Sequence, residues 1–165
     1  LESSNTAAKL LASKVGTKRF VDRMNAKAES LGMEDTIFTD PLGIEDTNVS
    51  TAKDLIRLLE YLYYNRSFIL RISSGEKVPT AYNVYSFDDI QNLNSHPSLS
   101  GFGGGQIGLA DEGEGIVAVY EIEVKGEVRP IAFVVLGADD QKHSLKSLYG
   151  YVLGQYDAKP VKDED

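Results

Sequence analysis

Two β-branched, apolar segments near the C-terminal end constrain the fold more than any other feature. Ile116 to Val124 and Val128 to Leu136 are separated only by Lys125-Gly126-Glu127, a pattern typical of an antiparallel β-hairpin. Ile122 and Val124 alternate with Glu121 and Glu123, so near the turn one face of the hairpin is expected to meet water. The amphipathic segment from about Ser144 to Tyr156 predicts a helix that covers this sheet.

Three segments in the first half of the chain have apolar residues at helical spacing. Each begins beside residues that can cap a helix, which are Asn5-Thr6, Thr17 and Ser50-Thr51. The first two predicted helices end at Gly16 and Gly32, and Asp54 would complete a capping box in the third. The order of these segments, with helices first and a hairpin later, predicts an α+β domain rather than a βαβ series.

The remaining segments are expected to be less regular. Asp40-Pro41-Leu42-Gly43 predicts a turn, and the mixed polarity from about Ser73 to Gly105 predicts loops and short strands. Residues 1–158 are interpreted as belonging to one domain. Residues 159–165 are interpreted as a frayed acidic tail or linker.

The charge balance excludes several classes of partner and cofactor. Lys and Arg number 17 against 25 Asp and Glu, for a net charge of −8, so nucleic acid and anionic membrane surfaces would be repelled. The absence of Cys, with only His96 and His143 as histidines, leaves too few ligands for a zinc site. We expect no metal and no cofactor. No apolar run approaches the roughly 20 residues of a membrane span, so any membrane attachment would come from segments outside this chain.

One glycine-rich motif is compatible with nucleotide binding. Gly103 to Gly108 has the spacing G-x-G-x-x-G, but such a loop must open a helix. The acidic, turn-like stretch Leu109 to Gly113 follows instead. A glycine-rich start of a strand is therefore the favoured interpretation.

Other short patterns could supply a nucleophile or a base. Ser50 and Ser74 each lie three residues before a lysine, Lys53 and Lys77, as in serine enzymes whose lysine deprotonates the nucleophile. A helix cap explains Ser50 more simply, and a flexible turn beside Gly75 explains Ser74. His96 and His143 could act as bases, although solvated histidines on an acidic surface are the commoner case.

A series of blocks along the chain is more specific than any single motif. The blocks are Ser3-Ser4-Asn5-Thr6-Ala7-Ala8, Met24-Asn25-Ala26-Lys27-Ala28, Leu31-Gly32-Met33, Thr36-Ile37-Phe38, Asp40-Pro41-Leu42-Gly43, Ser50-Thr51-Ala52-Lys53-Asp54-Leu55, Asn92-Leu93-Asn94, Gly104-Gly105-Gln106-Ile107-Gly108 and Val134-Val135-Leu136-Gly137. Their order resembles the serine-type D-alanyl-D-alanine carboxypeptidases, the low-molecular-mass penicillin-binding proteins. The resemblance implies part of a penicillin-binding protein/β-lactamase-like transpeptidase fold, an antiparallel sheet flanked by helices. The resemblance makes residues 1–158 the C-terminal portion of a carboxypeptidase-like domain, because the family's N-terminal segment with its nucleophilic Ser-x-x-Lys is missing. We expect that segment to be present when this chain folds, either in the same polypeptide before cleavage or as a partner segment.

The resemblance also implies which residues form the site. Ser3 and Asn5 match the family's Ser-x-Asn motif, in which the serine takes part in proton transfer and the asparagine binds the substrate peptide. The Lys-Thr-Gly motif falls on Gln106-Ile107-Gly108, so only the glycine is retained. The backbone N–H of Leu109 would belong to the oxyanion hole. A carboxylate-binding arginine is expected near Gln141 or Lys142, where neither residue matches.

The function implied is hydrolysis of peptidoglycan stem peptides in the extracytoplasmic cell envelope, with β-lactams as possible ligands. Because Gln106 and Ile107 lack the cation and hydroxyl of the motif, we expect activity to be reduced or lost, as in a pseudoenzyme. One alternative is a non-catalytic peptidoglycan-binding or scaffold domain. Another is a hydrolase for a peptide end that carries no free carboxylate.

Overall fold

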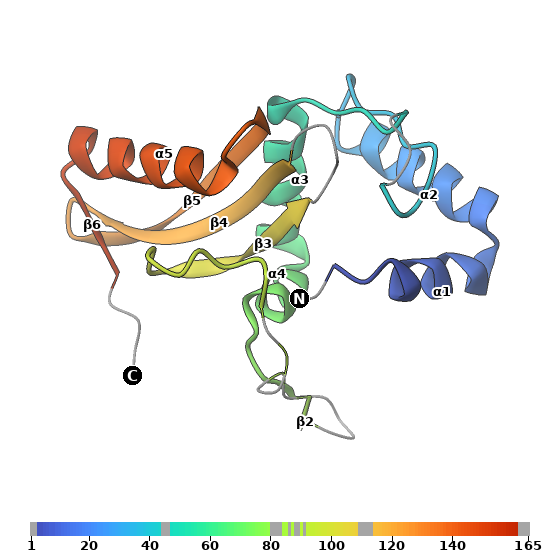
Figure 1. The fold of residues 1–165 in the computed structure, drawn as a ribbon, viewed down its shortest axis with the longest axis horizontal. Helices are drawn as coiled ribbons and strands as arrows, with labels where there is room; N and C mark the ends of the chain where they lie inside the picture. Colours follow the sequence, from blue (N-terminus) through green and yellow to red (C-terminus); the bar gives the residue numbers. More distant parts are fainter. Residues whose placement is uncertain are drawn as a thin grey trace.

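The hairpin predicted from the sequence forms two strands of a four-stranded antiparallel sheet in the computed structural model of the protein (Figure 1), and its first strand pairs with all the others. The structure describes residues 3–43, 47–79, 84–85, 87, 90, 92–108 and 114–161. The elements follow in the order α1 (Asn5–Val15), α2 (Thr17–Ser30), α3 (Ala52–Asn65), α4 (Ser67–Ser74), β1 (Val78–Pro79), β2 (Val84–Tyr85), β3 (Phe102–Gly108), β4 (Glu114–Val124), β5 (Glu127–Ala138), α5 (Gln141–Gln155) and β6 (Ala158–Pro160).

The turn between β4 and β5 explains why the hairpin forms. Val124 pairs with Glu127, which leaves Lys125 and Gly126 as a two-residue connection. Both have positive φ, +54° and +83°, the backbone that matches the right-handed twist of the paired strands. The predicted hairpin is confirmed, and Glu127 belongs to the strand rather than to the turn.

The other edge of β4 is shared by two strands. β3 pairs with it from Phe102↔Tyr120 to Gly108↔Gly115, and β6 continues along the same edge from Ile122↔Pro160 to Val124↔Ala158. Lys159 forms an ion pair with Glu123 at 3.0 Å. The segment interpreted as a frayed tail therefore begins inside a strand, and residues 162–165 lie outside the described residues.

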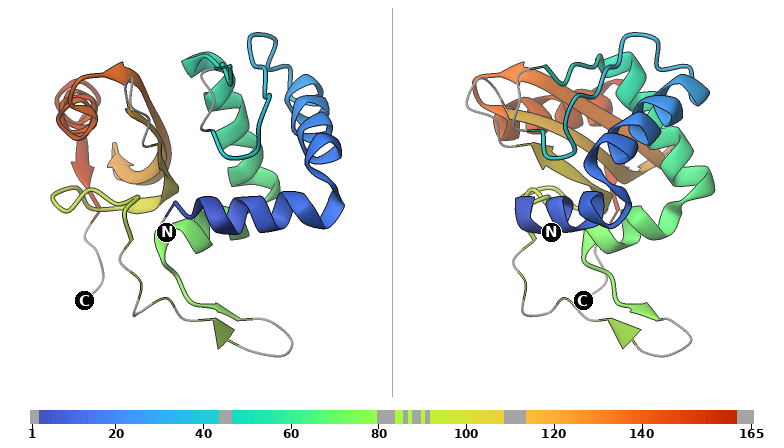
Figure 2. Two further views of the ribbon diagram at one scale, coloured as in Figure 1. Left: turned by 45° about the vertical axis from the view of Figure 1, so that its right-hand side comes forward. Right: turned by 90° about the vertical axis from the view of Figure 1, so that its right-hand side faces the viewer.

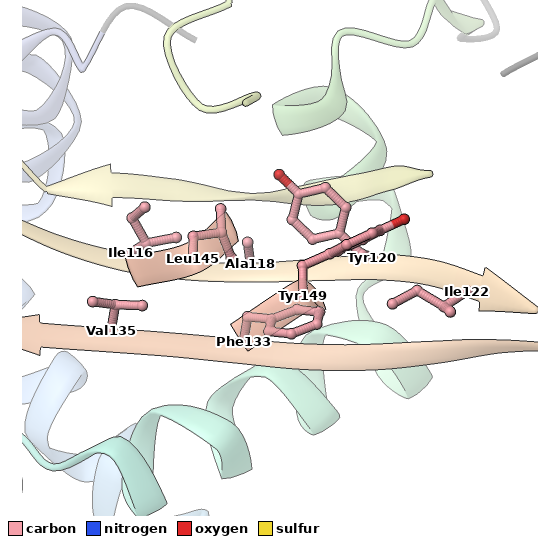
Figure 3. Packing of buried hydrophobic residues seen from close by; sticks show 8 residues of the cluster. All are labelled: Ile116, Ala118, Tyr120, Ile122, Phe133, Val135, Leu145 and Tyr149. Carbon is pink, nitrogen blue, oxygen red and sulfur yellow. The ribbon is translucent and has the colours of Figure 1, made fainter. Parts of the chain in front are cut away.

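The sheet buries a different set of side chains on each face because neighbouring residues of a strand point to opposite sides. α5 covers one face, where a cluster of eight buried residues forms the larger core (Figure 3): Ile116, Ala118, Tyr120, Ile122, Phe133, Val135, Leu145 and Tyr149. On the other face Val119 packs against Leu59 of α3 and Leu70 of α4. Burial raises the pKa of Tyr120 to about 12. The predicted cover of the sheet by the last helix is confirmed.

The first two helices project away from the sheet (Figure 2). α1 and α2 each contain a single buried residue, Ala12 and Ala28, while Leu10 and Leu11 of α1 are 59% and 64% exposed. α2 is tied to the next segment by Asn25, whose side chain donates to Phe38 O at 2.7 Å and accepts from Phe38 N at 2.8 Å. This part of the chain is therefore held largely by polar contacts.

A buried carboxylate attaches α3 to the connection that follows α2. Asp54 is 1% exposed, and its Oδ2 accepts hydrogen bonds from Asp35 N and Thr36 Oγ1, both at 2.9 Å. Arg57 pairs with Oδ1 at 3.3 Å and also donates to the carbonyl of Gly32. The Asp54 side chain thus holds a distant segment instead of completing the predicted capping box.

Several helix starts differ from the sequence prediction. Ser4 caps α1 by accepting from Ala7 N, so Asn5 is the first helical residue rather than part of the cap. Gly16 precedes α2 without a side-chain cap, which makes Thr17 helical. Thr51 rather than Ser50 caps α3. No helix was predicted at α4, and its last two residues, Ser73 and Ser74, were expected to lie in a loop.

The α+β class and the antiparallel sheet flanked by helices are as predicted. Over the described ranges, no helix has the length and apolar character to cross a membrane. In the same part of the chain, no cluster of three or more His, Asp or Glu side chains could hold a metal ion.

Candidate active site

Two predicted site residues that lie far apart in the sequence meet in the structure. The side-chain amide of Gln106 in β3 donates from Nε2 to Ser3 Oγ, at 2.7 Å, across a separation of 103 residues. Gln106 is exposed and Ser3 is half-buried, so the pair is open to a ligand. The N-terminal end of α1 and the edge of the sheet therefore form one site.

The backbone before α1 sets the position of Ser3. Ser3 has φ +49°, a left-handed conformation that is uncommon for residues with a side chain and recurs at functional sites. Ser4 turns its hydroxyl to the helix and caps it. Asn5, the other predicted catalytic residue, is exposed at the first position of α1. Ser4 thus caps the helix, which leaves the Ser3 hydroxyl to Gln106.

The glycines of β3 allow the strand to lie directly against neighbouring backbone. A Cβ atom on Gly104 would lie 2.3 Å from the carbonyl oxygen of Leu70 in α4, and one on Gly105 would lie 2.4 Å from that of Val117 in β4. Gly104 also has φ +124°, which side chains rarely tolerate. Gly103 to Gly108 is therefore part of a packed strand, as the sequence predicted, and is not a nucleotide-binding loop.

One edge of β3 faces away from β4 beside the Ser3–Gln106 contact. Gly105 N points to this edge, because it donates to Ser73 Oγ at 2.9 Å. In an antiparallel strand the backbone groups of alternate residues point to the same side, so those of Ile107 face this edge as well. Leu109, the expected oxyanion-hole residue, lies outside the described residues.

The Ser-x-x-Lys candidates have structural partners of their own. Ser50 Oγ lies 2.8 Å from Thr36 Oγ1 in the polar network of Asp54. Ser74 is the last residue of α4 and donates to Arg71 O at 2.8 Å. It is therefore helical, and the flexible turn predicted for it begins only at Gly75.

Neither histidine lies in the Ser3–Gln106 contact. His96 Nδ1 accepts from Ser98 N at 3.2 Å, and its pKa is lowered by burial and by the charges of Lys142 and Lys146. His143 stands in the first turn of α5, where its backbone N–H is capped by Asp140 at 2.8 Å.

An arginine was expected near Gln141 or Lys142, and the first of these is a buried amide. Gln141 is 1% exposed in the first turn of α5, while Lys142 beside it is exposed. A buried neutral side chain cannot present a cation to a solvent-filled site. Of these two residues only the exposed Lys142 carries a positive charge that a carboxylate could meet.

Sequence reasoning missed the contribution of α4 to the site. Ser73 contacts the strand one residue before Gln106, and Asn92 Nδ2 donates to Ser73 O at 2.9 Å. A short apolar segment followed by a glycine could have indicated this helix. Its residues are Phe68, Ile69, Leu70 and Ile72, with Gly75 after them.

Comparison with known sequences identifies a group of bacterial peptidases. A family model for D-alanyl-D-alanine carboxypeptidase matches residues 1–139. D-alanyl-D-alanine endopeptidases of Escherichia coli and Pseudomonas aeruginosa are 51% and 49% identical over 61 residues, 36% of this chain and 20% of each relative. That of Haemophilus influenzae is 40% identical over 76 residues, 45% of this chain and 26% of the relative. The matched segment thus spans about a fifth to a quarter of the curated relatives.

Comparison with solved structures supports the same architecture. The crystal structure of a penicillin-binding protein homologue from Mycobacterium tuberculosis matches with a TM-score of 0.65 and 24% sequence identity. The match covers 98% of this chain and 64% of that chain. At this identity the likeness concerns the fold.

Proposed function

The chain belongs to the D-alanyl-D-alanine carboxypeptidase family, and from this premise we propose that Ser3, Asn5 and the edge of β3 form part of a serine-hydrolase site for peptidoglycan stem peptides. The activity of this site is reduced relative to one that has Lys-Thr in place of Gln106-Ile107. The proposed location is the extracytoplasmic cell envelope. The observation that carries the proposal is the 2.7 Å hydrogen bond from Gln106 Nε2 to Ser3 Oγ.

The direction of this hydrogen bond supports a role in proton transfer. The Gln106 amide nitrogen can only donate, so the Ser3 oxygen is the acceptor and its own O–H remains a donor. A hydroxyl in this state can relay a proton, because it passes its own proton to a leaving amine and takes up the one that the attacking nucleophile loses. Asn5, exposed one residue past the Ser4 cap, would bind the substrate peptide through its side-chain amide.

Gln106 retains the hydrogen bond of a lysine at this position but not the charge. Hydrogen bonds with a charged partner contribute about 1.5–3 kcal/mol, against about 0.5–1.5 kcal/mol for neutral pairs. The missing charge therefore corresponds to roughly a tenfold lower rate if it acts in the transition state. Reduced activity, rather than a site without any chemistry, follows from this difference.

The outward edge of β3 suits an extended peptide. The backbone N–H and C=O of Ile107 face this edge, and an added strand could pair with them. Such a peptide would pass the Ser3 hydroxyl, which lies against the neighbouring Gln106. This arrangement agrees with a peptide substrate.

A second candidate function concerns the end of the peptide. Gln106 and Ile107 together offer neither a cation nor a hydroxyl to a terminal carboxylate. The matched relatives are named endopeptidases, and a bond inside a chain has no free carboxylate next to it. The site would then prefer peptides that continue beyond the scissile bond.

Fluorescent penicillin applied to the full natural polypeptide tests the main proposal. Wild type is expected to label slowly, Gln106→Lys to label about tenfold faster, and Ser3→Ala to label more slowly than wild type. Ser13→Ala is the matched control, because Ser13 is an exposed serine on the opposite end of α1 that bonds only within its own helix in the described contacts. Mass mapping of the adduct would identify the nucleophile.

The outcomes separate the candidate functions. Folded protein that takes no label, even as Gln106→Lys, would contradict a hydrolase and favour a peptidoglycan-binding or scaffold domain. Labelled protein that releases no D-alanine from a pentapeptide, but cleaves an amidated or cross-linked peptide, would favour the second candidate.

A further inference from the structure

The hydroxyl of Ser73 is the one side-chain group of α4 that is bonded to the backbone of β3 in the described contacts. Ser73 Oγ accepts from Gly105 N at 2.9 Å and donates to Leu70 O, one turn earlier in α4, at 2.8 Å. Ser73 is half-buried. The two bonds use the serine as acceptor and donor at once, so its rotamer is fixed from both sides.

We propose that Ser73 is a positioning residue for the site, which holds β3 at Gly105 so that the next residue, Gln106, presents its amide to Ser3. This inference rests on the proposed function for its role in catalysis. The geometric part rests only on the contacts of α4 with β3. Ser73 touches neither Ser3 nor a substrate position and acts through the strand.

The close packing of α4 on β3 explains why one hydroxyl has this effect. Gly104 lets the α4 backbone approach the strand, because any Cβ there would lie 2.3 Å from Leu70 O. Leu70, 4% exposed, anchors the helix in the cluster with Leu59 and Val119. Apolar packing therefore holds α4 in place, while the Ser73 hydroxyl determines where the edge of β3 lies along it.

A second contact fixes Ser73 itself. Asn92 Nδ2 donates to Ser73 O at 2.9 Å, and Asn92 Oδ1 accepts from Asn94 N at 2.9 Å. The end of α4 is thereby joined to the segment that leads into β3. Ser73 and Asn92 together connect three parts of the chain next to Gln106.

Ser73 also limits the edge to which a peptide can bind. Its hydroxyl already accepts the hydrogen bond from Gly105 N, so this N–H cannot bond to a peptide. The backbone of α4 lies directly against the strand at Gly104. A peptide that pairs with β3 therefore begins at Ile107. Because antiparallel partners run in opposite directions, α4 would lie beyond the C-terminal end of that peptide.

Ser73→Ala in the full natural polypeptide tests the proposal, and Ser74→Ala is its matched control. Ser74 makes the same kind of bond within α4, to Arg71 O at 2.8 Å, but its side chain has no described contact with β3. We expect Ser73→Ala to lower the rate constant of penicillin acylation roughly tenfold with little change in the dissociation constant of the initial complex. Ser74→Ala should stay within about twofold of wild type, and Ser73→Thr, which keeps a hydroxyl, should restore most of the rate.

Nuclear magnetic resonance supplies a readout that does not need activity. In Ser73→Ala, but not in Ser74→Ala, the Gly105 amide should exchange with solvent at least about tenfold faster, and the side-chain amide signals of Gln106 should shift. Unchanged Gly105 exchange and Gln106 signals would overturn the inference. If Ser73→Ala does not fold, rapid exchange of Gly105 in wild type would overturn it. Protein that shows both changes but takes no penicillin label would support the positioning role while contradicting the proposed function.

Discussion

The sheet with α5 and the helix pair α1–α2 each provide one half of the Ser3–Gln106 contact, but they are stabilised in different ways. The sheet and α5, here called the sheet side, bury eight residues in one hydrophobic cluster. Within it the ring centroids of Tyr120, Phe133 and Tyr149 lie 5.5–6.0 Å from one another. α1 and α2 bury one alanine each. The position of Gln106 thus follows from a packed core, whereas that of Ser3 depends on a helix cap and a few polar contacts.

This difference bears on how the site can vary. A strand in a packed core can change an exposed side chain without moving, so Gln106 can stand where the resemblance implies a lysine while the backbone of β3 keeps its place. Movement of α1 would separate Ser3 from Gln106 without disturbing the sheet. The Ser3–Gln106 contact therefore depends both on the sheet, which fixes Gln106, and on the position of α1, which carries Ser3.

The largest expected effect comes from truncating the core. Tyr120 is fully buried and contacts the rings of Phe102, Phe133 and Tyr149, so Tyr120→Ala should lower the free energy of unfolding by about 3–5 kcal/mol. Leu11→Ala in α1, where the side chain is 64% exposed, should change it by less than about 0.5 kcal/mol. Urea denaturation followed by circular dichroism measures both variants. Similar losses for the two variants would mean that Leu11 is buried in solution, and that α1 is stabilised by apolar packing as the sheet side is.

A smaller loss is expected from the buried carboxylate of the helical side. Asp54→Ala leaves Asp35 N, Thr36 Oγ1 and Arg57 without their shared acceptor and should cost about 2–3 kcal/mol. Asp22→Ala is the control, because Asp22 forms an exposed ion pair with Lys18 in α2 and such pairs contribute at most about 1 kcal/mol. Equal effects in the same denaturation assay would show that polar contacts do not hold this side together.

The sequence was sufficient where local patterns decide the structure. Periodicity predicted α1, α2, α3, α5 and the hairpin, because amphipathic faces and a two-residue turn are properties of neighbouring residues. The hydrogen bond between Ser3 and Gln106 does not follow from local patterns, because the two residues are 103 positions apart in the sequence. It was anticipated only through the resemblance to a family whose motifs meet in space, and the catalytic roles of these residues stay a prediction.

The features that were missed depend on contacts between distant segments. Asp54 has the spacing of a capping box, but its partners Asp35 and Thr36 lie 19 and 18 positions earlier. The acidic composition of residues 159–165 indicated a tail, but its first two residues, Lys159 and Pro160, pair with β4. α4 is only 8 residues long, and its place in the fold depends on glycines of β3 that follow some 30 residues later along the chain.

The smallest expected effect is a pH dependence of the free energy of unfolding, caused by His96 on the sheet side. His96 Nδ1 accepts from Ser98 N, which requires the neutral ring. Burial and the charges of Lys142 and Lys146 lower the pKa of His96 below its ordinary 6.5, against the opposing charge of Asp140. The unfolded chain therefore binds a proton more readily, so the stabilisation is complete above pH 6.5 and is lost as the pH falls below it.

Comparing wild type with His96→Asn between pH 7.5 and pH 5 tests this effect. The Asn side chain can accept from Ser98 N without titrating, so the variant should lose less stability on acidification, by less than about 1 kcal/mol. Because Leu99 packs against the α5 cluster and the hydroxyl of Tyr149 donates to Ser100 O, amide exchange should quicken at these positions in acid while that of α1 stays unchanged. The same acid response in both proteins would contradict a role for His96, and a response confined to α1 would reverse the order of stability between the two sides.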